Sequence, residues 1–260
     1  MKLKIYQVDA FANNIFGGNP AAVCPLEEWL PDETLQKIAL ENNLSETAFY
    51  VKKDNGFYIR WLTPTVEVNL CGHATLAAAY VLFFEEGYTD DKIVFDSRSG
   101  HLVVTRQGDI LTLDFPAAMI EPAELTPSLL DCFEQKPLKA FRNKTFYMLV
   151  FENESQVANL NPHLQAIAKL DSVGVIVTAK GDKVDFVSRF FGPQSGIDED
   201  PVTGSAHTLL TPYWSKMWGK NELTAVQLSA RKGYLTCTNL GERVLISGKA
   251  FLYMKGEVYI

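Results

Sequence analysis

The sequence lacks the cysteine and histidine spacing that metal sites and disulfide frameworks need. Its four cysteines are scattered over 260 residues without a CxxC pair, and its four histidines form no HExxH-like motif. In a chain of this size, isolated cysteines are typical of reduced thiols in a cytoplasmic protein. We therefore expect no metal, no disulfide and a cytoplasmic location.

Basic residues are not in excess either. With 24 Lys and Arg against 31 Asp and Glu, the net charge is −7, so no basic field exists to collect phosphates. The longest apolar runs, such as ATLAAAYVLFF, are shorter than a membrane span, and the opening MKLKIYQVDAF resembles a strand more than a signal peptide. Nucleic acid and membrane are therefore not expected partners.

Hydrophobic residues make up 47% of the chain, which is enough for one large domain or two small ones. The first half alternates strand patterns with two helix patterns, one opening at Asp32 and the other the alanine-rich CGHATLAAAYVLFFEEG. Asp54-Asn55-Gly56 between two apolar runs predicts a hairpin turn. From Pro116 to Lys139 the sequence predicts only a linker and a short helix around residues 128–133.

The order of patterns then begins again. Three segments of the first half match three of the second: Leu35-x-x-Ile38-Ala39 matches Leu164-x-x-Ile167-Ala168, Ser45-x-x-Ala48-Phe49 matches Ser172-x-x-Val175-Ile176, and RWLTP at 60–64 matches RFFGP at 189–193. Each half then enters a helix through small residues, Cys71-Gly72-His73-Ala74 in one and Thr203-Gly204-Ser205-Ala206 in the other. Four matches in the same order predict an internal duplication.

The duplication predicts an α+β fold of two pseudo-symmetric lobes, each a mostly antiparallel sheet rolled around a central helix. We place the N-terminal lobe at 1–116 and the C-terminal lobe at 117–260, with the closing strand free to return to the N-terminal lobe. In such a fold both helix N-termini face one cleft between the lobes, where two helix dipoles and free N–H groups converge on a ligand.

The acidic stretch GIDEDPVTGSAH, at 196–207, predicts a loop that ends at one of these helix starts. Its side-chain oxygens and backbone N–H groups could hold an anionic substrate. An ordinary capped helix after an acidic loop is the alternative, and the stretch alone does not decide between them.

Candidate catalytic residues stand where the repeat is broken. Glu46 corresponds to Val173, His73 to Ser205, and Asp200 to Val68. A half-buried carboxyl at position 46 would have a raised pKa and could exchange a proton, and a histidine at a helix N-terminus tends to be neutral. The alternatives are an exposed strand-edge glutamate, a surface histidine in a first helical turn, and an aspartate that caps a helix.

FGGNPAAV, NLSETAF, NLCGHAT and GIDEDPVTGSAH together strongly resemble the phenazine-biosynthesis isomerase-like (PhzF-like) family, over essentially the whole chain. The resemblance implies a diaminopimelate epimerase-like fold, a cytoplasmic homodimer, and an isomerase that uses neither metal nor cofactor. It implies glutamate acid/base catalysis on a small carboxylate in the interlobe cleft. The residues that it implies are, as catalytic groups, Glu46, Asp200 and His73, and, as substrate-binding groups, Ser205, Gly72, Gly204 and Ser45.

Two other functions stay open. The epimerase relatives carry two catalytic cysteines where this chain has Cys71 and Thr203, so a two-thiol racemase is disfavoured, but an epimerase or racemase that uses Cys71 with another base is possible. A non-catalytic binder of small molecules on the same fold is the second alternative. The sequence does not identify the substrate or the pathway.

Overall fold

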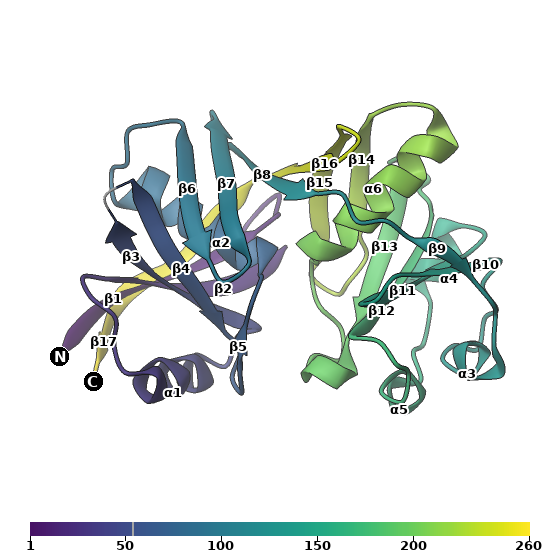
Figure 1. The fold of residues 1–260 in the computed structure, drawn as a ribbon, viewed down its shortest axis with the longest axis horizontal. Coiled ribbons are helices and arrows are strands. Elements are labelled where there is room, and N and C mark those ends of the chain that lie inside the picture. Colours follow the sequence, from purple (N-terminus) through teal and green to yellow (C-terminus); the bar gives the residue numbers. More distant parts are fainter. Residues whose placement is uncertain (54) are drawn as a thin grey trace. The chain divides into compact units, whose positions relative to one another are not determined.

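The computed structural model describes residues 1–53 and 55–260, and it divides into two compact units (Figure 1). The first unit comprises residues 1–115 and 245–260, and the second comprises 116–244. The chain therefore leaves the first unit once and comes back to it at residue 245, and its last strand pairs antiparallel with the first.

The first unit is built on one sheet with strands in the order β17, β1, β2, β3, β4, β6, β7, β8, and β5 pairs with β4. Most pairs are antiparallel, but β2–β3 and β4–β6 are parallel. β16 pairs with β8. The strands are β1 (Lys2–Ala10), β2 (Asn19–Leu26), β3 (Glu46–Lys53), β4 (Gly56–Leu62), β5 (Glu67–Val68), β6 (Lys92–Ser97), β7 (Gly100–Gln107), β8 (Ile110–Pro116), β16 (Arg243–Gly248) and β17 (Ala250–Tyr259).

The alanine-rich segment forms helix α2 (Gly72–Tyr80), which packs against β1, β2, β3 and β17. Every residue from Gly72 to Ala79 is buried, because its small side chains let the sheet approach the helix closely. A π-helical turn, η1 (Val81–Glu85), continues α2. Helix α1 (Asp32–Asn42) packs against β3 and β4, and its Leu35, Ile38 and Ala39 belong to a separate apolar cluster.

The second unit has the strand order β9, β10, β11, β12, β13, β14, β15. Its long helix α6 (Gly204–Trp218) packs against β14 and β15, and Trp214 of α6 donates a hydrogen bond to Thr178 Oγ1 of β12 at 2.9 Å. The strands are β9 (Glu121–Ala123), β10 (Lys139–Arg142), β11 (Phe146–Val150), β12 (Gly174–Lys180), β13 (Phe186–Phe191), β14 (Glu222–Gln227) and β15 (Gly233–Asn239). The short helices are α3 (Pro127–Leu130), α4 (Glu154–Ala158), α5 (Leu164–Ile167) and the 3₁₀ turn η2 (Pro193–Ser195).

The two units repeat the same pairing pattern. β2–β3 parallel, β3–β4 antiparallel, β4–β6 parallel and β6–β7 antiparallel correspond in turn to the pairs β11–β12, β12–β13, β13–β14 and β14–β15. A matching ion pair accompanies it. Arg60 binds both carboxylate oxygens of Glu67 at 2.9 and 2.6 Å, and Arg189 binds both oxygens of Glu199 at 2.7 and 2.9 Å. The topology and these contacts support the predicted duplication.

The structure also corrects several expected elements. The helix expected over NPHLQAIAKL has a single turn, Leu164–Ile167, and α4 precedes it. The stretch expected to be a linker includes the strand Glu121–Ala123, and β14 had no counterpart among the expected elements. Strands β3 and β4 pair antiparallel, but Asp54 of the expected turn lies outside the described residues. In the part of the chain that is described, none of the helices combines the length and apolar character that crossing a bilayer requires.

Candidate active site

Glu46 and His73 meet inside the first unit. Glu46 is the first residue of β3, and His73 lies in the first turn of α2, which packs against β3. The side chains are buried, with Glu46 8% and His73 3% exposed, so neither is the surface residue of the alternative interpretation. Glu46 Oε2 lies 3.2 Å from His73 Nε2, although the contact does not have the angle of a good hydrogen bond.

Asn19 determines which of the two ring nitrogens of His73 carries the proton. The amide Nδ2 of Asn19, at the start of β2, lies 3.1 Å from His73 Nδ1. The amide N–H donates to Nδ1, so a neutral ring carries its own proton on Nε2, the nitrogen next to Glu46. His73 is thus a donor toward the carboxylate.

The imidazole stays neutral because it is buried. Loss of hydration lowers the pKa of His73 to about 3. The ring is therefore neutral, as the sequence led us to expect. The expected cause was the position of His73 at a helix N-terminus, but the cause of the lowered pKa is burial. An imidazole with this pKa does not hold a second proton at neutral pH.

Cys71 completes this cluster, and its Sγ lies 3.5 Å from Nδ1 of His73. Among the described residues, Glu46, Cys71 and His73 are the one set of donors close enough to hold a metal ion, with ligand atoms within 4.8 Å of one another. The ring contacts Cys71 through Nδ1 and Glu46 through Nε2.

A second polar cluster lies at the start of α6 in the second unit. Thr203 donates its hydroxyl proton to Asp200 Oδ2 at 2.6 Å, and its backbone N–H donates to Gln227 Oε1 at 2.9 Å. The amide of Gln227 in turn donates to the Asp200 carbonyl at 2.7 Å and lies 3.1 Å from Thr203 Oγ1. Asp200 is buried, 8% exposed, and its side chain accepts the hydroxyl proton of Thr203. Its carboxylate is therefore held in one orientation.

One turn further along α6, His207 contacts this cluster through the backbone of Thr203. It is fully buried, and its Nδ1 donates to the Thr203 carbonyl at 2.8 Å. Burial lowers the pKa of His207 to about 4, so this ring is neutral as well. Ser205, half-buried, lies in the first turn of α6 next to the buried Gly204.

The two helix starts share a backbone geometry. Cys71 and Thr203 are both N-caps with extended backbone, at φ −143° and −112°, and neither side chain caps its helix. The first helical residue after each is a glycine, Gly72 or Gly204. No N-cap side chain therefore accepts from the first-turn N–H groups, which suits them to an anionic ligand. Ser45, also among the predicted binding residues, is half-buried and directly precedes β3.

The structure thus gathers Glu46 and His73 in one cluster, and Asp200, Gly204 and Ser205 at the other helix start. Sequence reasoning missed Asn19 and Gln227. Both are neutral amides, whose side chains carry no chemical signal in a sequence. Only the placement of Asn19 within FGGNPAAV could have drawn attention to it.

Comparison with known proteins agrees with the fold. Residues 8–256 match the profile of a family described as phenazine biosynthesis-like protein (PhzC-PhzF). A protein of Pseudomonas aeruginosa named an uncharacterized isomerase is 51% identical over 260 residues, covering 100% of both chains. The human phenazine biosynthesis-like domain-containing protein is 38% identical over 286 residues and covers 99% of each chain.

Solved structures give the same result. A phenazine biosynthesis protein of the PhzF family from Enterococcus faecalis superposes with a TM-score of 0.97 at 47% identity, covering 100% of both chains. A probable proline racemase from Agrobacterium radiobacter shares the fold, with a TM-score of 0.65 at 9% identity and coverage of 99% of this chain and 93% of that one. The predicted diaminopimelate epimerase-like α+β fold is confirmed. Together with the profile match over nearly the whole chain, these likenesses mean that the chain belongs to the phenazine biosynthesis-like protein family, which includes proteins named isomerases.

Proposed function

We propose that this protein is an isomerase that moves a proton, and with it a double bond, within a small carboxylate, without a metal or cofactor. The observation that carries the proposal is the buried contact between Glu46 and the neutral His73, with Asn19 directing the ring proton toward the carboxylate. The membership of the family, in which relatives are named isomerases, supports the reaction class.

In the proposed reaction the Glu46 carboxylate removes a proton from a substrate carbon, and the resulting carboxyl returns it to another carbon. His73 donates through Nε2–H and keeps Glu46 or a substrate oxygen in position, because its lowered pKa prevents it from holding a second proton. Asp200, held by Thr203, and Ser205 bind polar groups of the substrate. The N–H groups beside Gly72 and Gly204, together with Ser45, bind its carboxylate.

The test combines a substrate screen with a conservative substitution. Small unsaturated carboxylates are incubated with the protein in D₂O, and proton NMR identifies those that exchange or move a proton. Glu46→Gln should lower turnover by about 10²–10⁴-fold while binding is nearly unchanged, because only the general base is lost. Glu41→Gln, which changes an exposed glutamate of α1, is the matched control and should retain full activity. Full activity of Glu46→Gln would refute the mechanism.

An epimerase that uses Cys71 is the second candidate, because the thiol lies 3.5 Å from the His73 ring. Its counterpart Thr203 is bonded to Asp200 and has no thiol, so a symmetrical two-base reaction has only one such group. The same D₂O experiment separates the two candidates. A racemase exchanges the α-proton with inversion and stops in Cys71→Ala, whereas the proposed isomerase moves the double bond and keeps most of its activity in that variant.

The cytoplasmic location and the homodimer also belong to the proposal. The scattered cysteines support a reducing compartment, since all four are buried and none forms a disulfide within the described residues. The resemblance to the family supports the homodimer. Light scattering on the purified protein tests it, and a monomer at micromolar concentration would contradict it.

A further inference from the structure

Glu46, Cys71 and His73 bring a carboxylate, a thiol and an imidazole to one place in the first unit. Each residue offers one ligand atom, and the three atoms lie within 4.8 Å of one another. The proposed reaction uses the carboxylate and the imidazole but gives the thiol no role. A soft sulfur ligand beside a nitrogen and an oxygen ligand suits zinc, whereas magnesium and calcium take mainly oxygen ligands.

The spacing of these atoms fits a tetrahedral zinc ion. Zinc bonds of about 2.3 Å to sulfur and about 2.0–2.1 Å to nitrogen, opened to a tetrahedral angle, place the two ligand atoms about 3.5 Å apart. Cys71 Sγ lies 3.5 Å from His73 Nδ1, so this pair already has the required separation. A carboxylate oxygen of Glu46, which lies within 4.8 Å, needs to move by at most about 1.5 Å to join them.

The tautomer of His73 leaves the required nitrogen available. The ring proton is on Nε2, so Nδ1, which faces the thiol, has the lone pair. An ion bound here replaces the thiol proton: the S–H bond breaks, the proton leaves to solvent, and the thiolate sulfur and Nδ1 each donate an electron pair to the metal. Asn19 competes with the ion, because its amide lies 3.1 Å from the same Nδ1 and has to withdraw.

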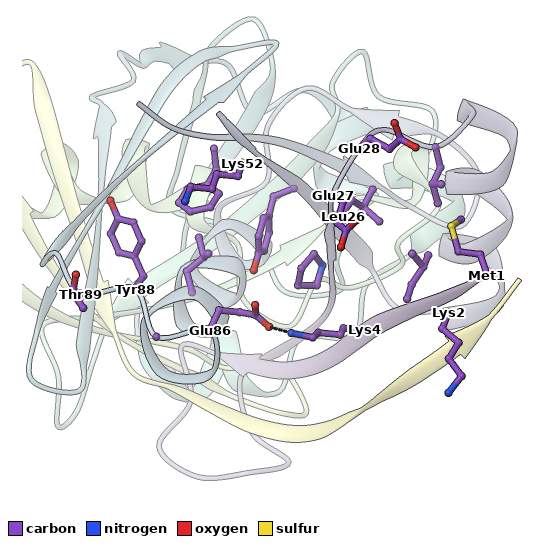
Figure 2. A pocket seen from close by; sticks show the side chains of 17 residues that line it. Met1, Lys2, Lys4, Leu26, Glu27, Glu28, Lys52, Glu86, Tyr88 and Thr89 are labelled. Atoms are coloured by element: carbon purple, nitrogen blue, oxygen red, sulfur yellow. Dashed lines mark hydrogen bonds and ion pairs between the residues drawn. The ribbon is translucent and has the colours of Figure 1, made fainter. Parts of the chain in front are cut away.

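The open pocket of the same unit offers no comparable set of donors (Figure 2). This cavity of about 780 Å³ is lined by the carboxylates of Glu27, Glu28 and Glu86, but also by lysine ammonium groups, which repel a cation. Figure 2 shows Lys4 Nζ against Glu86, at 3.0 Å from Oε1. Among the described residues, no cysteine or histidine lines the pocket. A zinc ion should therefore prefer the buried cluster.

We propose that Glu46, Cys71 and His73 form an inhibitory zinc site. The ion takes the Cys71 thiolate, His73 Nδ1 and one Glu46 oxygen as ligands, and one position stays open for water. It is an inhibitor and not a cofactor, because it occupies the carboxylate that removes the proton. The inhibition rests on the proposed isomerase reaction, and the route that brings a substrate to Glu46 also admits the smaller ion. Glu46 and Cys71 retain 8% and 7% of their surface exposed.

Cobalt(II) is the spectroscopic probe of the site, and competition between zinc and a chelating dye measures the affinity. A cobalt–thiolate bond gives a charge-transfer band in the near ultraviolet, which the wild type should show and Cys71→Ala should lack. Cys71→Ala should weaken zinc binding at least about 100-fold, more than the roughly 10–100-fold that loss of an outer-shell partner costs. Asn19→Ala should bind zinc about fivefold more tightly, because the competing hydrogen bond is gone.

Two control variants keep the binding result interpretable. Cys237→Ala removes a buried thiol of the second unit and should keep the cobalt band. His101→Gln removes an exposed histidine whose Nδ1 lies 2.6 Å from Asp96 Oδ1, a pair that could hold zinc at the surface. Its affinity for zinc should equal that of the wild type.

Turnover gives the second measurement. Micromolar zinc should inhibit the wild type and EDTA should restore the rate, whereas magnesium at the same concentration should have no effect. The turnover that remains in Cys71→Ala should need about 100-fold more zinc for the same fractional inhibition, in line with its weaker binding.

The proposal is overturned if the cobalt complex of the wild type lacks the thiolate band, or if zinc binds Cys71→Ala as tightly as the wild type. It is equally overturned if bound zinc leaves turnover unchanged or raises it. Failure of the isomerase mechanism gives a different result, since Glu46→Gln then keeps full activity while the cobalt band and the effect of Cys71→Ala on zinc binding persist.

Discussion

Which residue of the Glu46–His73 pair is the proton donor depends on the neutral amide of Asn19. Asn19 Nδ2 donates to Nδ1 of the ring, which leaves the ring proton on Nε2 beside the carboxylate. The candidate site is therefore a series of three side chains, in which the outermost residue has no acid/base chemistry of its own. Its contribution is orientation.

Removing the amide of Asn19 should change the tautomer of His73 and leave the fold intact. In Asn19→Ala, Nδ1 loses its amide donor, and we expect turnover to fall by about tenfold, the effect of one well-placed hydrogen bond. Nitrogen-15 NMR of the His73 ring should show protonated Nε2 in the wild type and a mixture of tautomers in the variant. Asn143→Ala is the control, because that amide accepts from two backbone N–H groups of a turn in the second unit and should not affect turnover. An unchanged ring spectrum in Asn19→Ala would disprove this role.

Gln227 also acts through a neutral amide, in the second unit, where it holds Thr203 and Asp200 through three contacts. Gln227→Met keeps the shape but leaves the Thr203 N–H and the Asp200 carbonyl unpaired in a buried place. The free energy of unfolding should fall by about 2–6 kcal/mol, at roughly 1–3 kcal/mol for each of the two groups. Urea unfolding measures it, with the exposed Gln107→Met as a control that should change stability by less than about 0.5 kcal/mol. A variant as stable as the wild type would show that Gln227 does not hold the helix start.

At the scale of elements, the segments with clear periodicity could be predicted and the short ones could not. The alternation in β1 and the alanine-rich α2 follow from side-chain pattern alone. β14 does alternate in burial, but six residues between a helix end and a loop are too short to stand out. The segment around Leu164 has the apolar spacing of a helix, yet only one turn forms before β12 begins at Gly174.

The site could be predicted in part for a similar reason. The broken repeat singled out Glu46, because its counterpart Val173 is apolar and, in the structure, exposed. Burial of Glu46 and His73 could not be predicted, since it depends on β3 and α2 packing together. The contacts of Asn19 and Gln227 depend on strands distant in the sequence.

The matched Arg–Glu pairs connect an element to its neighbours in each unit. Besides Glu199, Arg189 donates to the carbonyls of Val157 and Leu160, at 3.2 and 2.8 Å, and so ties β13 to the segment around α4. Arg189→Lys keeps the charge but loses the two-pronged geometry, and stability should fall by about 1–3 kcal/mol. Lys37→Gln, which breaks an exposed pair with Glu33, should cost less than about 0.5 kcal/mol. Equal effects of the two changes in urea unfolding would contradict the structural role of Arg189.

At the scale of the whole molecule, the two units have the same arrangement of helices and strands but different titratable side chains. Each unit has its central helix, its parallel and antiparallel pairs in the same order, and its Arg–Glu pair. The titratable groups differ, with Glu46 and Cys71 in the first unit and Asp200 in the second. A buried neutral histidine on the central helix is nevertheless common to both, at position 73 in one and 207 in the other.

These two histidines should make the protein sensitive to acid. Burial lowers the pKa of His73 to about 3 and of His207 to about 4, against an ordinary value of 6.5. Below 6.5 the unfolded chain binds protons that the folded chain does not, so stability is complete above that pH and is lost as the pH falls toward the folded values. Each histidine contributes up to about 1.4 kcal/mol per pH unit in this window. Urea midpoints between about pH 7 and pH 5 should fall accordingly.

His207→Asn, whose amide can still donate to the Thr203 carbonyl, should remove about half of the pH dependence. An unchanged pH dependence of stability would mean that His207 is not neutral in the folded protein.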